Sequence, residues 1–271
     1  MVSAHAGAVL CVAIFPGLFT VLGIASAQEL SFAAFVEAAG YRSDEYRFGT
    51  LFNRENGTLT GSYLRAGYIN GPWRSVVEHR NISGTLDYQG QTQFGVPIAS
   101  QTGLKYSQSG ILAAYQPGNT PWYAGIALRS RALDRRIHAT PITQALHETL
   151  RQTEWGPVVG AAWDPTQNIS LSVQFIALIT QRSTLDVDFL GSYDSGRLAL
   201  PRNASRDLQI ALRYRVNSSY SFAMEVCGQR FIPEKSLPAP LTTHGISVGL
   251  YNYPGSTQKL WTLGAGAVIH W

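Results

Sequence analysis

The last eleven residues, Trp261-Thr-Leu-Gly-Ala-Gly-Ala-Val-Ile-His-Trp271, carry the clearest structural pattern in the chain. Apolar side chains occupy every second position from Trp261 to Trp271, and mostly small or polar residues lie between them. A period of two places successive side chains on opposite faces of a β-strand. The stretch therefore predicts a strand with one apolar face that carries an aromatic residue at each end.

The same alternation recurs earlier in the chain, at 155–163, 169–180, 207–216 and 220–227. Aromatic residues lie near both ends of the apolar face, and Gly, Ser, Gln, Arg and Glu dominate the other face. This arrangement suits a barrel whose outside meets lipid. A closed barrel is also the only kind of sheet that spans a bilayer without unpaired backbone groups. The pattern predicts an all-β fold, a transmembrane antiparallel up-and-down β-barrel.

Composition supports this class. The chain has 271 residues, of which 45% are hydrophobic and 14% are charged, with a formal net charge of +4. Soluble domains usually carry about 25% charged residues, so a soluble helical enzyme is disfavoured. Two cysteines cannot form a disulfide framework. The small charge surplus and the absence of a basic stripe disfavour nucleic acid as a partner.

Residues 1–27 have the features of an export signal. They contain no Asp, Glu, Lys or Arg, they are apolar from Gly7 to Ile24, and they end in Ala25-Ser26-Ala27. Small residues at such spacing are what a signal peptidase requires. We expect a cleaved signal peptide at 1–27 and a barrel with long external loops at 28–271, located in the cell outer membrane. An uncleaved transmembrane anchor is the alternative, because the apolar stretch approaches the length of a span.

Turn-forming segments divide the mature chain into about ten strands. Every second connection is short, and the others are expected to run to roughly ten residues or more, as in outer-membrane barrels with short periplasmic turns. A segment near 243–253 also alternates, so eight or twelve strands are alternatives, and 141–150 is a candidate short helix. The predicted strands lie near 32–47, 57–70, 73–86, 102–116, 122–134, 150–163, 168–182, 204–216, 220–231 and 258–271.

In these features the chain resembles bacterial outer-membrane β-barrel proteins as a general class. The resemblance implies that Trp261, Leu263, Ile269 and Trp271 belong to the signal that the barrel-assembly machinery reads. It also implies a place among outer-membrane lipid and lipopolysaccharide. It implies no activity, because this architecture carries pores, enzymes, adhesins and scaffolds alike.

The polar face of the strands should line a narrow lumen. Opposed arginines and carboxylates can fill such a lumen with charge-assisted hydrogen bonds and so hold the barrel rigid. An arginine-lined path for small solutes or anions is the alternative, although ten strands are well short of a wide channel. The charges expected there are Arg74, Glu78, Arg80, Glu154, Arg213, Arg215 and Glu225, with Arg65, Arg129 and Arg131 on the same face.

A cluster of basic residues runs from the fifth predicted strand into its loop, and consists of Arg129, Arg131, Arg135 and Arg136. Arginine forks match phosphate geometry, so the cluster predicts binding of an anionic ligand or of lipopolysaccharide. Alternatively, Asp134 and Glu148 partly neutralise the run, which would then be a solvated rim.

Catalytic residues are harder to assign. Asp186, Asp188 and Asp194 lie in the fourth long loop, which permits a loop-based surface hydrolase, either lipid-modifying or similar to the omptin proteases. However, no histidine follows an aspartate at the i, i+2 spacing of the omptin pair. We therefore assign no catalytic residue, no metal and no cofactor. We expect an outer-membrane barrel with a structural or surface-binding role and a polar, plugged lumen, of unknown oligomeric state.

Overall fold

The computed structural model describes residues 28–91 and 95–271, so the predicted signal peptide lies outside the described residues. This part of the chain is all-β and contains no helix that could cross a membrane. Its strands are β1 (Gln28–Arg47), β2 (Thr50–Asn70), β3 (Trp73–Gln91), β4 (Pro97–Tyr115), β5 (Trp122–Ile137), β6 (Leu146–Thr166), β7 (Ile169–Asp188), β8 (Gly196–Ala199), β9 (Ala204–Arg215), β10 (Tyr220–Phe231), β11 (Ala239–Thr243), β12 (Ile246–Tyr251) and β13 (Ser256–His270).

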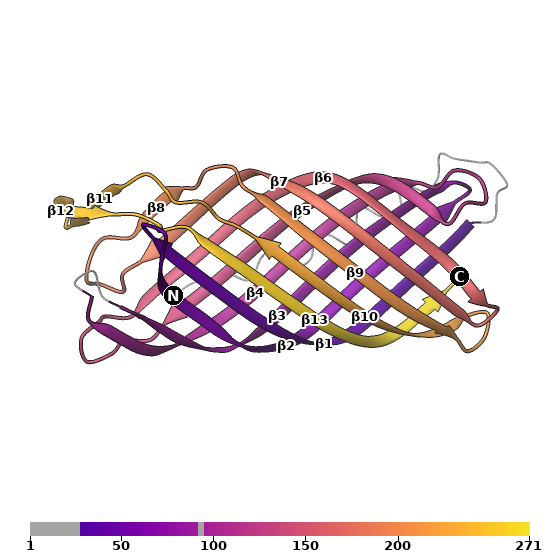
Figure 1. Cartoon of the computed structure of the whole chain (residues 1–271), viewed down its shortest axis with the longest axis horizontal. Coiled ribbons are helices and arrows are strands. Elements are labelled where there is room, and N and C mark those ends of the chain that lie inside the picture. Colours follow the sequence, from indigo (N-terminus) through magenta and orange to yellow (C-terminus); the bar gives the residue numbers. More distant parts are fainter. Residues whose placement is uncertain (1–27, 92–94) are drawn as a thin grey trace, which may run out of the picture.

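Ten of these strands close into one antiparallel barrel (Figure 1). The order around the wall is β6-β5-β4-β3-β2-β1-β13-β10-β9-β7, and β7 pairs with β6 to complete the circle. Neighbours along the chain are neighbours in space nearly everywhere, which is the up-and-down arrangement. The predicted fold class and the preferred strand number are confirmed.

The three remaining strands lie at the end of the barrel with the long connections (Figure 1). β9 begins at Ala204, opposite Ile179 of β7, and β8 pairs with β7 further along, at Thr184–Val187. β8 and β9 therefore act as one interrupted strand. β11 and β12 form a separate hairpin in the connection between β10 and β13. The alternating segment near 243–253 therefore extends a loop and does not add a pair of strands to the barrel.

Two local expectations were wrong. Three of the connections expected to run to roughly ten residues or more are shorter, since only residues 92–96 separate β3 from β4 and only residues 138–145 separate β5 from β6. The connection between β1 and β2 is the two-residue turn Phe48-Gly49, because positive φ angles of 52° and 80° match the twist of a tight hairpin and let both strands continue. The candidate helix at 141–150 is absent. Residues Leu146 to Leu150 pair with β5 instead, because ladder pairing with a neighbouring strand outweighs a weak helical pattern.

The outward face carries an apolar band, as predicted. A ring of exposed aromatic side chains surrounds the end with the short turns, and Trp155 and Trp261 lie at the opposite edge of the band. Aromatic girdles at both edges are typical of barrels that meet lipid. The ring consists of Trp73, Tyr115, Trp122, Trp163, Tyr214, Tyr220 and Trp271.

The inward face is more apolar than the sequence suggested. A cluster of buried apolar and tyrosine side chains fills the lumen in the half nearest the long loops, and includes Leu104, Tyr106, Leu133 and Phe231. A polar network lies next to it, and two smaller apolar clusters lie toward the short turns. The barrel is therefore a packed body along much of its axis.

Candidate functional site

A polar network crosses the lumen from wall to wall. Tyr106 on β4 and Gln229 on β10 are separated by five steps around a ten-stranded wall, so they face each other from opposite sides. The Tyr106 hydroxyl donates to Gln229 Oε1 over 2.7 Å, and Gln229 Nε2 donates to Gln108 Oε1 over 3.2 Å. All three side chains are buried. Direct bonds between opposite walls close the lumen at this level.

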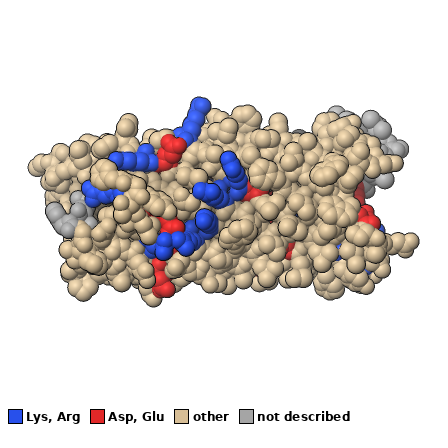
Figure 2. All heavy atoms as spheres, in the orientation of Figure 1, with Lys and Arg blue, Asp and Glu red and all other residues tan. Residues whose placement is uncertain are grey.

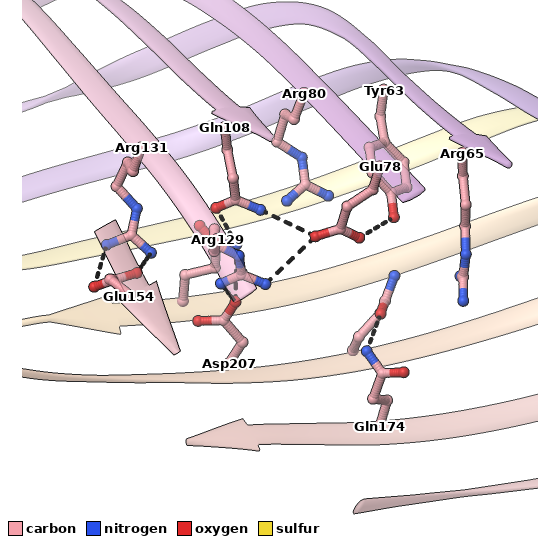
Figure 3. A network of polar contacts seen from close by, with 12 residues as sticks. Tyr63, Arg65, Glu78, Arg80, Gln108, Arg129, Arg131, Glu154, Gln174 and Asp207 are labelled. Carbon is pink, nitrogen blue, oxygen red and sulfur yellow. Dashed lines mark hydrogen bonds and ion pairs between the residues drawn. The ribbon is translucent and has the colours of Figure 1, made fainter. Parts of the chain in front are cut away.

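Ion pairs lie beside this bridge, and Figure 3 shows those of Arg129 and Arg131. Arg80 donates from Nε and Nη2 to the two carboxylate oxygens of Glu37, over 2.8 and 3.0 Å. Arg129 pairs with Asp207 and reaches Glu78 Oε1 at 3.5 Å, while Glu78 also accepts a 2.8 Å bond from Tyr63. Each pair links strands that are not adjacent, so the network fastens the wall from the inside.

Arg131 and Glu154 form the most deeply buried pair. Both side chains have no exposed surface, and Arg131 Nη2 lies 3.2 Å from Glu154 Oε2. The guanidinium also lies over the Phe231 ring, 4.2 Å from its centroid. A cation that is paired on one side and stacked on the other is fixed by its surroundings. Arg131 therefore joins the polar network to the apolar cluster.

The basic cluster predicted on β5 is not assembled on an outer surface. Odd-numbered residues of β5 face the lumen, so Arg129, Arg131 and Arg135 are buried. Arg135 is held by three carboxylates, those of Glu45, Glu55 and Glu148. Arg136 has the opposite parity and is exposed. The continuation of the β5 ladder to Ile137 places Arg135 inside the barrel, where the sequence had suggested a loop.

The seven predicted lumen charges divide into two groups. Glu78, Arg80, Glu154 and Glu225 belong to the network or border it. The other three, Arg74, Arg213 and Arg215, line a cavity in the half of the barrel nearest the short turns, and Glu225 also borders this cavity.

A row of cations on the outer wall was not anticipated. Arg230 on β10 is directly opposite Arg206 on β9 and Lys259 on β13, and Lys259 is opposite Arg42 on β1. All four are exposed. The acidic residues of β9 and β10, Asp207 and Glu225, face the lumen. Figure 2 shows lysine and arginine atoms gathered over the half of this face that carries the long loops. The alternation of side chains along each strand is enough to place each of these residues on the outer face. Aligning them in a row also requires the pairing register between neighbouring strands.

The structure also brings together an aspartate and a histidine that are distant in sequence. Asp134 Oδ2 lies 2.9 Å from His147 Nε2, and Asp188 is opposite His147 on the next strand. Asp186 is occupied by Arg151 and Arg197, so it is not free to act as a base. These groups lie on the outer wall, and the ladder register that pairs β5 with β6 was not visible in the sequence.

A second polar relay lies near the C-terminal end of β13. Ser221 Oγ is 3.0 Å from His270 Nε2, and His270 Nδ1 is 3.0 Å from Glu29 Oε1. This is the connectivity of a serine–histidine–acid relay. However, Ser221 is only 2% exposed, and neither Ser221 nor His270 lines the adjacent cavity. We therefore assign no reaction to it.

Comparisons with known proteins identify a fold and no family. No protein-family model and no curated protein matches the chain. The solved structure of the outer membrane protease OmpT from Escherichia coli is similar at a TM-score of 0.61, with 9% identity, over 90% of this chain and 96% of that one. Two weaker matches are OprG from Pseudomonas aeruginosa, covering 90% and 96% of the two chains (TM-score 0.37, 8% identity), and Ail from Yersinia pestis, covering 90% and 99% (TM-score 0.35, 11% identity). The chain therefore has the fold of bacterial outer-membrane β-barrel proteins.

Proposed function

We propose that the protein is an integral outer-membrane barrel with a closed lumen, exported through cleavage after Ala27, which holds anionic glycolipid of the outer leaflet against its wall. The long loops then face outward from the cell. The observation that carries the proposal is the row formed by Arg206, Arg230, Lys259 and Arg42.

Charge repulsion within the row points to a ligand. Like charges directly opposite one another on neighbouring strands destabilise a sheet. Of the four cations in the row, only Arg42 has a carboxylate partner within the described residues, Asp44 at 2.8 Å. Arg206, Arg230 and Lys259 have none there. A bound anion between these three side chains would remove the repulsion and satisfy the guanidinium donors.

The position of the row indicates which anion. The next outward positions toward the short turns are Leu208 on β9, Gly228 on β10 and Trp261 on β13, where the apolar band begins. Cations at this edge lie at the depth of lipid head groups, with an exposed indole beside them. Lipopolysaccharide carries phosphates at that depth, so its phosphorylated lipid A portion is the proposed ligand.

Binding to purified glycolipid tests the proposal. The refolded protein in detergent is titrated with phosphorylated lipid A, and binding is compared with that of Arg206→Gln/Arg230→Gln/Lys259→Gln. Near a charged membrane surface each basic residue contributes about 1 kcal/mol, so the triple variant should bind about 100-fold more weakly at low salt. The wild-type protein should also bind dephosphorylated lipid A weakly.

A matched control removes three exposed cations elsewhere, in Arg47→Gln/Arg136→Gln/Arg202→Gln, and should retain the wild-type affinity. Heat-modifiable migration in gels verifies that every variant is folded. If the two triple variants lose the same affinity for lipid A, the effect of the row is nonspecific charge attraction and the proposal is rejected. Equal affinity for phosphatidylglycerol would reject lipid A as the ligand.

A narrow path for small anions is the second candidate function. The cavity near the short turns favours it, because Arg74, Arg213 and Arg215 line an opening into the barrel. The bridge between Tyr106 and Gln229 opposes it by crossing the lumen beyond that cavity. Conductance across a planar bilayer separates the two functions, since regular current steps would favour the pore.

A further inference from the structure

The cavity in the half of the barrel nearest the short turns has the properties of a binding site. Its volume is about 330 Å³, and its lining comes from both sides of the barrel wall. Toward the long loops the polar network and the apolar cluster close the lumen. The cavity is therefore a pocket with one opening, at the end of the barrel that carries Trp271.

Four arginines line this cavity from two opposite sides. Arg65 on β2 and Arg74 on β3 face Arg213 and Arg215 on β9, and β3 and β9 are five steps apart around the wall. Figure 3 shows Arg65 projecting into the lumen at the edge of the network. Placing several cations around one small space is costly unless negative charge compensates for it.

The protein supplies little of that compensation. Arg65 reaches Glu225 only at 3.9 Å, and Glu225 also lies 3.5 Å from Arg80. Arg74 donates to an uncharged partner, Gln116, over 2.6 Å and stacks over the Tyr123 ring. In the described chain Arg213 and Arg215 have no side-chain hydrogen bond or ion pair.

Three acidic residues line the cavity against the four arginines, and Glu225, one of the three, is shared between Arg65 and Arg80. Glu29 is hydrogen-bonded to His270, at 3.0 Å. Asp164 is exposed near the C-terminal end of β6 and forms no ion pair within the described residues. Positive charge therefore exceeds the negative charge available to it, and hydroxyl donors stand beside it on Ser31, Ser75, Ser170 and Ser172.

We propose that this cavity binds a small polyanion that carries phosphate groups, entering from the periplasmic side. Guanidinium forks and hydroxyls are the donors that recognise phosphate oxygens. Opposite placement of Arg65 and Arg213 suits a ligand with two phosphate groups, one for each wall. The site lies at the other end of the barrel from the outward cation row, so the two bind independently.

Pyrophosphate is the probe for this site. Calorimetric titration of the refolded full barrel at low salt should give saturable binding with one site per protein. Arg65→Gln/Arg213→Gln should weaken it about tenfold or more, because two charge-assisted contacts are lost. Arg74→Gln/Arg215→Gln should also weaken pyrophosphate binding about tenfold or more, and it replaces the first variant in the test if that variant does not fold. Orthophosphate should bind more weakly than pyrophosphate, since it cannot reach both walls.

The matched control is Arg206→Gln/Arg230→Gln, which removes two cations from the outer wall and should leave pyrophosphate binding unchanged while it weakens lipid A binding. Arg65→Gln/Arg213→Gln should show the reverse pattern, so failure of this site and failure of the glycolipid site are distinguishable. The proposal is overturned if the wild-type protein shows no saturable pyrophosphate binding, or if both double variants of the cavity arginines bind pyrophosphate as tightly as the wild type. It is also overturned if succinate binds as tightly as pyrophosphate.

Discussion

Tyr106 and Gln229 lie on opposite walls of the barrel and share a 2.7 Å hydrogen bond through the lumen. Such a bond requires that the lumen be filled by side chains at this level. Gln108 completes the bridge by accepting from Gln229. The arrangement makes the barrel interior a structural core, with consequences for permeability and stability that can be measured.

The first prediction concerns access to the lumen. Cys227 faces the lumen next to this bridge and is 3% exposed, so a water-soluble methanethiosulfonate should not label it in the folded barrel that begins at Gln28. Unfolding should make it reactive. Ser170→Cys in a Cys227→Ser background places a thiol in the cavity and should label readily. Labelling of folded Cys227 at the same rate would indicate an open lumen.

The second prediction concerns the buried pair of Arg80 and Glu37. Arg80→Met leaves Glu37 buried and uncompensated, and should lower the free energy of unfolding by about 3–5 kcal/mol. Arg80→Met/Glu37→Met removes both charges and should cost less than the sum of the two single variants. Urea unfolding in lipid vesicles, followed by tryptophan fluorescence, measures this coupling. Strict additivity would mean that the pair is not coupled.

The third prediction concerns Trp261, whose ring lies over Gly228 on the neighbouring strand. A Cβ atom at Gly228 would overlap the indole, whereas one at Gly40, the register partner on the other side, would meet nothing within 4 Å. Gly228→Ala should therefore destabilise the barrel by about 1–3 kcal/mol through overpacking. Gly40→Ala is the control and should fold normally. Similar unfolding midpoints for the two variants would contradict the packing argument.

The fourth prediction concerns the contact between two long loops. Asp194 accepts from the N–H groups of Gly245 (2.9 Å) and His244 (3.1 Å) in the turn between β11 and β12. The Gly245 hydrogen bond, followed by that from Thr242, holds the pKa of the Asp194 carboxyl below its usual value.

Because the folded-state pKa of Asp194 is depressed, its stabilising contribution is complete above the usual aspartate pKa of about 4 and is lost as the pH falls through the lowered value. Asp194→Ala should make the β11–β12 hairpin more sensitive to proteolysis at neutral pH, without changing barrel stability. Asp164→Ala, near the C-terminal end of β6 at the other end of the barrel, is the control. Equal cleavage of all three proteins would show that the contact does not hold the hairpin.

The fifth prediction concerns closure between the first and last strands. Trp271 N donates to Leu30 O over 2.9 Å, and Leu30 N donates back over 3.2 Å. If Trp271 also belongs to the signal read by the barrel-assembly machinery, Trp271→Ala should reduce the amount of folded barrel in cells while refolding in detergent stays efficient. Trp122→Ala is the control, because Trp122 belongs to the same girdle of exposed aromatic side chains. A loss confined to detergent refolding would assign Trp271 a purely structural role.

The alternating pattern of single strands was sufficient to predict much of this structure. Trp261 to Trp271 and the earlier alternating stretches predicted the barrel, its apolar outside, and the inward direction of Arg80, Glu154 and Glu225. Those properties are local, because the side-chain period of a strand is two whatever its partners are.

The alignment of Arg206, Arg230 and Lys259, the contact of Asp134 with His147, and the bond from Tyr106 to Gln229 were decided by the tertiary structure. Each depends on which residues of separate strands lie opposite one another and on how the sheet closes. Register and closure are set by turn geometry and by packing across the lumen, which join residues as far apart in sequence as Glu29 and His270, 241 positions. The sequence by itself determined the two faces of each strand, and the closed barrel determined which side chains meet, because only closure brings opposite walls within hydrogen-bonding distance.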